Sequence, residues 1–378
     1  MKILYILDNL SKSSGVSSVA IELYRHLSKR NITIDFLVST KKKNSYEKEI
    51  LEMGSKIFYS GNYLSVKESL KAIRFTKKFF NKNGSDYDIV HLHSPTIALF
   101  TLKYAQKANI KSRIVHSHST MMTTSKFKNL IHHILLPSVK KYGNIFWACS
   151  TEAGIFLYGE EFHEENKIEI INNAVDCDNF YFDKDMRFST RTNLKVNQEK
   201  LFIHISNYNP LKNHFFLLDV IEKLKNNGNR VKFIFVGEGP TKNRFITEIE
   251  TKNLKNMCVF LNQTTDITKY LCAADAIILP SKKEGLPVTL VEAQATGLPF
   301  FTSDSVTKEV CVGSGTFLPL EKEIWYKELE EFNPVSIETR NLAAETFYLT
   351  KFNIRNEANR VEKLYESLLK QGDIYEKK

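Results

Sequence analysis

Short apolar runs alternate with longer stretches of helical apolar spacing along the chain. In its first part this pattern predicts strands at residues 3–7, 32–38 and 89–92 and helices at 19–27 and 66–80. Alternating strands and helices are typical of parallel sheets whose strands are connected by crossover helices. We therefore predict an α/β domain for this part of the chain.

The same alternation restarts after a polar stretch at 176–200, which has few regularly spaced apolar residues and is interpreted as a linker. The second part is predicted to contain strands at 201–206, 231–236, 259–261, 276–279 and 300–302 and helices at 215–224, 267–272 and 290–295. The expected organisation is an N-terminal domain at 1–175 and a C-terminal domain at 176–355. Residues 356–378 are expected to form a C-terminal helix that packs back on the first domain, because apolar residues recur there at helical spacing.

A length of 378 residues, with 42% hydrophobic and 25% charged residues, fits two folded domains that each bury a core. Disordered chains and small disulfide-stapled folds are excluded. Five cysteines without a C-x-x-C pair predict reduced thiols. No apolar run is long enough for a signal peptide or a membrane-spanning helix. We therefore expect a cytoplasmic protein, with any membrane contact peripheral and at the inner face of the cell membrane.

The net charge of +10 belongs to the first part of the chain. Residues 1–172 hold 25 lysines and arginines against 15 acidic residues, and 89–151 contain no acidic residue. The basic residues of that stretch include Lys126, Lys128, Lys140 and Lys141. Two interpretations stay open: a solvated basic face, or a surface that meets an anionic partner or membrane. The apolar positions of 126–136 likewise fit either a membrane-facing helix or a core helix.

Candidate ligand-binding residues follow the predicted strands, where open parallel sheets bind their ligands. Gly237 and Gly239 come directly after one strand, and Gly15 lies in a serine-rich loop before the first helix. These loops lack the spacing of a dinucleotide fingerprint or a P-loop, so oxidoreductase and ATPase functions lose support. The structural alternatives are a tight turn at the two glycines and serine capping of the helix.

The segment 279–293 carries the most informative pattern. Glu284 lies in the loop after a predicted strand, and Pro287 is placed at the first turn of the next helix. The free amides at the start of that helix, near residues 286–289, form a ready site for a diphosphate. Glu284 is placed to bind sugar hydroxyls, and Glu292 is placed to accept a hydrogen bond from a ribose hydroxyl.

Glu284 and Glu292, with seven residues between them, resemble the donor-site motif of retaining glycosyltransferase family 4. Further stretches that look like the signatures of this family follow the same order along nearly the whole chain, at 88–93, 114–118, 148–150, 170–176 and 210–214. The resemblance implies the GT-B architecture, in which two Rossmann-like domains with parallel sheets face a central cleft. It also implies a nucleotide-sugar donor, with no bound metal and no further cofactor.

Individual residues take their expected roles from this resemblance. Lys212 matches the lysine that contacts the donor diphosphate, and His118 matches the histidine near the reacting sugar, so catalysis is assigned to His118, Lys212 and Glu284. The residues expected to bind the donor are Gly15, Ser206, Asn207, Lys212, Gly237, Gly239, Glu284, Gly285, Leu286, Pro287, Val288 and Glu292. The histidines expected to be mostly structural are His91, His93 and His116.

The chain departs from the family pattern at Ser206 and Asn207, which stand where Gly-Arg is usual. The arginine of the phosphate clamp is therefore missing, and Asn207 donates hydrogen bonds without contributing charge. Lys282 and Lys283 are the candidates to replace that charge.

The favoured function is a retaining glycosyltransferase that moves a hexose or N-acetylhexosamine from a nucleotide-diphosphate sugar, with UDP as the expected nucleotide, to a sugar acceptor. A polyprenyl-diphosphate-linked acceptor in a bacterial capsule or exopolysaccharide pathway would suit the basic first domain. The alternatives are a nucleotide-sugar epimerase and a catalytically silent GT-B subunit that supports a partner transferase. A nucleic-acid partner is not expected, because no recognised binding module or aromatic-basic motif is present.

Overall fold

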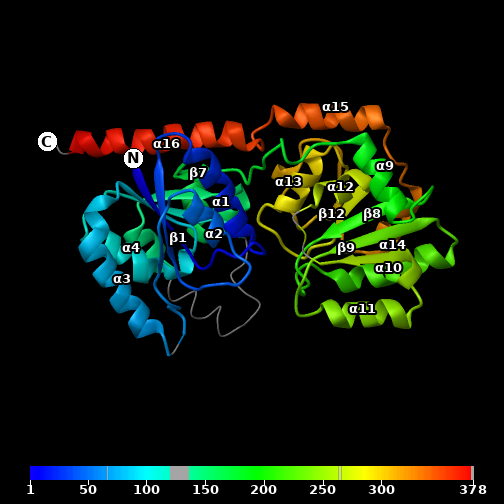
Figure 1. Ribbon diagram of the computed structural model, residues 1–378, viewed down its shortest axis with the longest axis horizontal. Helices are drawn as coiled ribbons and strands as arrows, with labels where there is room; N and C mark the ends of the chain where they lie inside the picture. Colours follow the sequence, from blue (N-terminus) through cyan, green and yellow to red (C-terminus); the bar gives the residue numbers. More distant parts are fainter. Residues whose placement is uncertain (66, 120–135, 263, 265, 376–378) are drawn as a thin grey trace. The chain divides into compact units, whose positions relative to one another are not determined.

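The computed structural model describes residues 1–375 apart from 66, 120–135, 263 and 265. The chain forms two compact units, one made of Met1–Asn173 and the chain from Ile354 onward, the other of Ala174–Asn353 (Figure 1). The expected boundaries, after 175 and after 355, lie two residues further along the chain in both cases.

In the described part of the chain, the first unit is built on seven strands that all pair in parallel. Their order is β3-β2-β1-β4-β5-β6-β7. The strands are β1 Lys2–Leu7, β2 Thr33–Val38, β3 Ile57–Tyr59, β4 Ile89–Leu92, β5 Ser112–Ser117, β6 Ile145–Ala148 and β7 Ile168–Ile170. Residues 3–7 are at most 1% exposed. The inner strand β1 is therefore a continuous apolar run, as expected for a parallel strand covered on both faces.

All but the last of the described helices of the first unit connect these strands. The described helices are α1 Gly15–Leu27, α2 Glu47–Glu52, α3 Ser69–Asn83, α4 Ala98–Lys107, α6 Pro137–Tyr142, α7 Thr151–Tyr158, α8 Glu160–Glu164 and α16 Ile354–Tyr375, with 3-10 turns η1 Gly84–Asp86 and η2 Pro95–Ile97. The helix predicted at 66–80 thus begins and ends three residues later, as α3. Figure 1 shows α16 alongside α1, where Arg30 pairs with Glu362 at 2.6 Å.

The second unit has six described strands, again paired in parallel, in the order β10-β9-β8-β11-β12-β13. The strands are β8 Lys200–Ile205, β9 Val231–Val236, β10 Cys258–Leu261, β11 Ala276–Leu279, β12 Phe300–Ser303 and β13 Gly315–Leu318. The helices are α9 Lys184–Asn193, α10 His214–Asn226, α11 Lys242–Thr251, α12 Thr268–Ala273, α13 Val288–Ala295, α14 Lys322–Glu331 and α15 Ile337–Tyr348, with 3-10 turns η3 Lys255–Met257 and η4 Lys308–Val310. Figure 1 shows α10, α11 and α14 on one face of this sheet and α9, α12, α13 and α15 on the other.

The polar stretch at 176–200 is not a linker, and that prediction was wrong. It contains α9, which is capped by Asp183 and packs on the second unit. Two arginines of α9 reach Asp275, which is 3% exposed: Arg187 at 2.5 Å and Arg191 at 3.2 Å. Because this helix is anchored by arginine side chains rather than by an apolar face, the periodicity of apolar residues did not reveal it.

Within the described residues, no helix is long and apolar enough to cross a membrane. The cores are apolar and rich in aromatic residues; in the second unit Phe202, Phe233, Phe235, Phe245 and Trp325 are at most 1% exposed. The five cysteines are free thiols. Each unit therefore has its own packed core, as the length of the chain predicted.

Candidate active site

The loops that follow β9, β8 and β11 meet at the carboxyl edge of the second sheet, because these three strands are neighbours and run in the same direction. Backbone hydrogen bonds join the loops. The Tyr208 N–H donates to the Glu238 carbonyl at 2.9 Å, and the Lys282 N–H donates to the Leu211 carbonyl at 2.8 Å. Residues from distant parts of the sequence are thereby assembled into one surface.

Lys212 and Glu284, 72 positions apart, come from two of these loops and form an ion pair between Nζ and Oε1. Their side chains are 22% and 13% exposed. The Lys212 N–H donates to the Asn209 carbonyl at 3.2 Å. The next residue, Asn213, adopts a left-handed φ of 57° and is the N-cap of α10. The structure therefore brings together the lysine and the glutamate that the resemblance selected.

The helix after Glu284 begins one residue later than expected. Pro287 is the N-cap of α13 rather than part of its first turn, because its ψ of 111° is extended and not helical. The first N–H groups of a helix have no acceptor within it, so the amides of Val288 and Thr289 are donors for an anion. The residues buried just before the helix are Gly285, Leu286 and Pro287. Glu292 is half-buried on α13.

Gly237 and Gly239 are required by a close approach of two loops. Their φ angles are 147° and 154°, in a region that favours glycine. A Cβ atom at Gly237 would lie 2.0 Å from the Ser206 carbonyl oxygen, and one at Gly239 would lie 2.5 Å from the Tyr208 carbonyl oxygen. These glycines therefore let the loops after β8 and β9 pack directly on each other, a structural reason that the tight turn considered above did not include.

Ser206 points at two buried histidines that the sequence analysis did not select. His204 Nδ1 lies 2.8 Å from the Ile278 carbonyl oxygen, so this nitrogen carries the proton and donates. The Ser206 hydroxyl, 2.8 Å away, then donates to His204 Nε2 and accepts from His214 Nε2 at 3.3 Å. Burial lowers the pKa of His204 to about 4, which keeps it neutral. Ser206 thus ties the end of β8 to the start of α10, two residues beyond Lys212, while Asn207 is exposed.

In the first unit, His118 follows β5 directly and is hydrogen-bonded to His93, with His93 Nδ1 and His118 Nε2 2.9 Å apart. Burial lowers the pKa of His118 to about 3, so the ring is neutral at pH 7. Gly15 opens α1, where the Ser14 side chain caps the helix by accepting from the Ser17 N–H. A Cβ atom at Gly15 would have no neighbour within 4 Å, so packing does not require glycine there.

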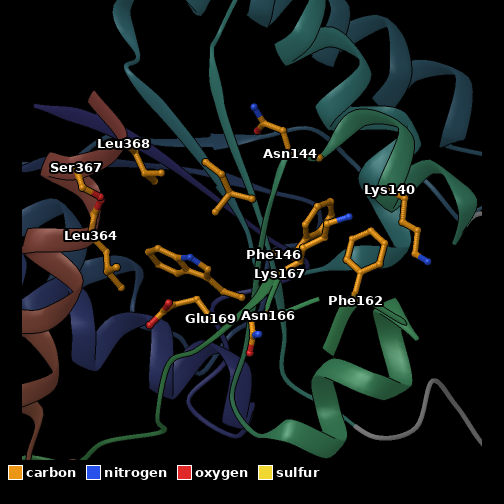
Figure 2. A pocket seen from close by; sticks show the side chains of 13 residues that line it. Lys140, Asn144, Phe146, Phe162, Asn166, Lys167, Glu169, Leu364, Ser367 and Leu368 are labelled. Atoms are coloured by element: carbon orange, nitrogen blue, oxygen red, sulfur yellow. The ribbon is translucent and has the colours of Figure 1, made fainter. Parts of the chain in front are cut away.

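Figure 2 shows a separate cavity of about 510 Å³ in the first unit. It lies at the amino-terminal ends of β6 and β7, opposite the edge that carries His118. Phe146 and Phe162 form part of its wall, and Lys140 lies over the Phe162 ring at 4.2 Å. None of the residues that line it was expected to bind the donor. Of the basic residues considered above, Lys126 and Lys128 lie outside the described residues.

The two halves of the chain match two family models. Residues 13–179 match the model described as Glycosyltransferase Family 4, and residues 185–315 match the one described as Glycosyl transferases group 1. Among solved structures, HepE of Anabaena in complex with UDP-glucose superimposes with a TM-score of 0.78, at 17% identity over 97% of this chain and 100% of that one. That identity supports the fold alone.

Two curated relatives span most of the chain. It is 29% identical to the glycosyltransferase named EpsF of Bacillus subtilis (strain 168) over 317 residues. The matched stretch covers 83% of this chain and 82% of that protein. It is 26% identical over 308 residues to the UDP-Gal:alpha-D-GlcNAc-diphosphoundecaprenol alpha-1,3-galactosyltransferase of Escherichia coli, with 77% and 76% covered.

Two Rossmann-like units, with a lysine and a glutamate meeting at the carboxyl edge of the second, define a glycosyltransferase of the GT-B class. The chain belongs to glycosyltransferase family 4. The expected family and fold class are thus confirmed, while the roles of single residues stay predictions.

Proposed function

We propose that the protein is a retaining transferase that moves a hexose or N-acetylhexosamine from a UDP-sugar to a lipid-linked sugar acceptor of capsule or exopolysaccharide synthesis. The observation that carries this proposal is the ion pair between Lys212, in the loop before α10, and Glu284, in the loop before α13. The names of similar proteins support the substrates: one relative uses UDP-Gal and a GlcNAc-diphosphoundecaprenol acceptor, and HepE was solved with UDP-glucose.

The leaving nucleotide diphosphate gains negative charge during transfer, and Lys212 supplies the cation that offsets it. An ammonium group has three N–H donors, so Lys212 can keep its bond to Glu284 and still donate to a phosphate oxygen. The amides at the start of α13 add the positive end of a helix dipole. On this proposal no metal and no further cofactor is needed.

Glu284 binds hydroxyls of the donor sugar, and Glu292 accepts a hydrogen bond from the ribose. In the transfer step the bond between the sugar C1 and the diphosphate oxygen breaks, and a bond from C1 to the acceptor oxygen forms on the same face of the sugar. The acceptor proton passes to the departing diphosphate oxygen, so atoms and charge balance without another reactant. His118 contacts the donor sugar and helps to place the acceptor.

The missing arginine at Asn207 is compensated, on this proposal, by Lys282 or Lys283. Both are exposed in the loop after β11. The backbone of Lys282 is bonded to Leu211, the residue before Lys212. The backbone at Lys282 therefore lies beside the segment that carries Lys212, the residue assigned to the diphosphate.

UDP release, measured with a panel of UDP-sugars and a polyprenyl-diphosphate-linked sugar acceptor, tests the proposal. Rapid release is expected only when donor and acceptor are both present. Lys212→Ala should lower kcat/KM by about 100-fold to 1000-fold, the usual cost of removing one donor to developing charge. Lys327→Ala, which removes an exposed lysine of α14 in the same unit, is the matched control and should leave kcat/KM unchanged.

Two outcomes would overturn the proposal. Consumption of the nucleotide sugar without acceptor, at an unchanged rate, would favour the epimerase. No turnover and no thermal stabilisation by any UDP-sugar would favour the catalytically silent subunit, which Asn207 in place of arginine motivates.

A further inference from the structure

Four histidines line one face of the first sheet at the carboxyl ends of β4 and β5. Alternate residues of a strand face the same side, so His91 and His93 share a face, as do His116 and His118. The rings stack along each strand with centroids 4.0 Å apart in both cases. Because β4 and β5 pair directly, the two stacks stand next to each other.

Hydrogen bonds join these rings in two pairs across the strands. His91 Nε2 lies 3.1 Å from His116 Nδ1, and His93 Nδ1 lies 2.9 Å from His118 Nε2. The first pair is anchored by Tyr365 of α16, whose hydroxyl is 2.7 Å from His91 Nδ1. The second pair ends at His118, the histidine assigned to the reacting sugar.

His118 Nδ1 is buried and has no hydrogen-bond partner within the described residues, and the same holds for His93 Nε2 at the other end of the pair. Since His93 occupies Nε2, Nδ1 is the ring nitrogen left to meet a ligand hydroxyl. A neutral pair of imidazoles shares one proton along its hydrogen bond, so the donor in that bond decides whether Nδ1 carries a proton. Burial of both rings lowers their pKa values and keeps the pair neutral.

We infer that His93 is a positioning residue, which holds the His118 ring in one orientation, with Nε2 turned toward His93 and Nδ1 toward the reacting sugar. The inference rests on the proposed function, because it takes the role of His118 from it. The imidazole torsion about the Cβ–Cγ bond is broad when nothing restrains it. Without His93, the ring can turn and exchange Nδ1 for Cδ2 at the face that meets the sugar.

A metal ion is the competing explanation of the cluster, because ring nitrogens of His91, His93 and His116 lie within 4.8 Å of one another. Two nitrogens bound to one tetrahedral zinc ion, each at about 2.0–2.1 Å from it, would lie about 3.3–3.4 Å from one another. The observed pairing, at 2.9 and 3.1 Å between nitrogens, is instead the geometry of a shared proton. Zn²⁺ binding is therefore included among the outcomes of the test.

Three variants at one position separate positioning from simple burial. His93→Asn places an amide group where Nδ1 now lies and can keep the bond to His118. His93→Gln carries the same amide one bond further out, at the position of Nε2, and is the matched control. His93→Leu fills the site without any hydrogen bond.

Two measurements read out the effect: the ¹⁵N NMR shifts of the His118 ring, and steady-state UDP release. In the wild type we expect the Nε2 shift of a hydrogen-bonded ring nitrogen in His118, retained in His93→Asn and moved toward that of a ring without this bond in His93→Leu and His93→Gln. The last two should lower kcat by about 10-fold to 100-fold, the cost of a misplaced reacting group, with KM for the UDP-sugar changed by less than about twofold.

The inference is overturned if His93→Leu keeps the wild-type ¹⁵N shifts of the His118 ring and wild-type kcat, or if all three variants lose kcat equally. Stoichiometric Zn²⁺ uptake by the wild type that His93→Leu abolishes would also overturn it. If the wild type releases no UDP with any donor, the proposed function fails. The ¹⁵N shifts of the His118 ring then still decide whether His93 positions His118.

Discussion

At Gly237 a hydrogen atom in place of a side chain lets two loops of the second unit cross. A Cβ atom there would lie 2.0 Å from a backbone oxygen of Ser206, which cannot move aside as a flexible side chain can. Glycine patterns after a strand are commonly taken as ligand sites. Here the contact with the neighbouring loop is sufficient to explain the residue.

Gly237→Ala should lower the free energy of unfolding by about 1–3 kcal/mol, because it adds a clash to an unfavourable φ. Urea denaturation measures the loss. Gly15→Ala is the matched control, since a Cβ atom there meets nothing within 4 Å. Equal midpoints for wild type and Gly237→Ala would contradict the packing explanation.

At the scale of elements, α9 shows how a polar segment becomes part of a domain. Arg187 and Arg191 both reach the carboxylate of Asp275, which also accepts from the Leu201 N–H at 2.7 Å. Asp275 therefore links α9 to the first strand of the second sheet. The carbonyl groups of residues 272–274 accept further hydrogen bonds from these two arginines, so α9 packs on the domain through polar contacts rather than an apolar face.

Asp275→Ala should destabilise the second unit by about 3–5 kcal/mol, because it leaves two partly buried guanidinium groups without their carboxylate. Chemical denaturation followed by a probe in this unit measures the change. Asp219→Ala removes a more exposed carboxylate of α10, 44% exposed, and should cost less than about 1 kcal/mol. If the two variants lose the same stability, α9 is not held through Asp275.

At the scale of the whole molecule, buried neutral histidines tie stability to pH. The histidines whose pKa is lowered by burial are His91, His93, His116, His118, His204 and His214. Their pKa values in the folded state lie below the unfolded value of about 6.5, so the unfolded chain binds more protons as the pH falls below it. Above about pH 6.5 these histidines do not reduce the free energy of unfolding. Below that pH the free energy of unfolding decreases progressively.

Stability should therefore fall between pH 7.5 and 5.5, with each of these histidines contributing up to about 1.4 kcal/mol per pH unit below its unfolded pKa. Urea midpoints at a series of pH values provide the measurement. The exposed His163 gives the control, since His163→Gln should leave the dependence on pH unchanged. A urea midpoint that is constant over this pH range would show that the six buried histidines bind protons without lowering the free energy of unfolding.

The basic residues of the first unit lead to a prediction about membranes. Lys140 and Lys141 are exposed at the end of α6, and each lysine near an anionic surface contributes about 1 kcal/mol. Changing both to glutamine should weaken binding to anionic liposomes by about tenfold to thirtyfold. Donor affinity should not change.

The matching double variant Lys308→Gln/Lys327→Gln removes two exposed lysines from the second unit. It should leave liposome binding unchanged. If both pairs weaken binding equally, net charge rather than the first unit attracts the protein to the membrane. If neither does, the basic residues belong to a solvated face, the interpretation that the sequence left open.

The amino-acid sequence by itself determined the two α/β domains and the loops that carry Lys212 and Glu284. Buried parallel strands require continuous apolar runs, and the carboxyl ends of such strands share one edge. Only the tertiary structure decided which side chains meet: Lys212 with Glu284, Ser206 with His204, and His93 with His118. It also decided that α9 belongs to the second unit. Local periodicity reports burial, whereas these contacts depend on how strands and loops are packed side by side, which no local pattern encodes.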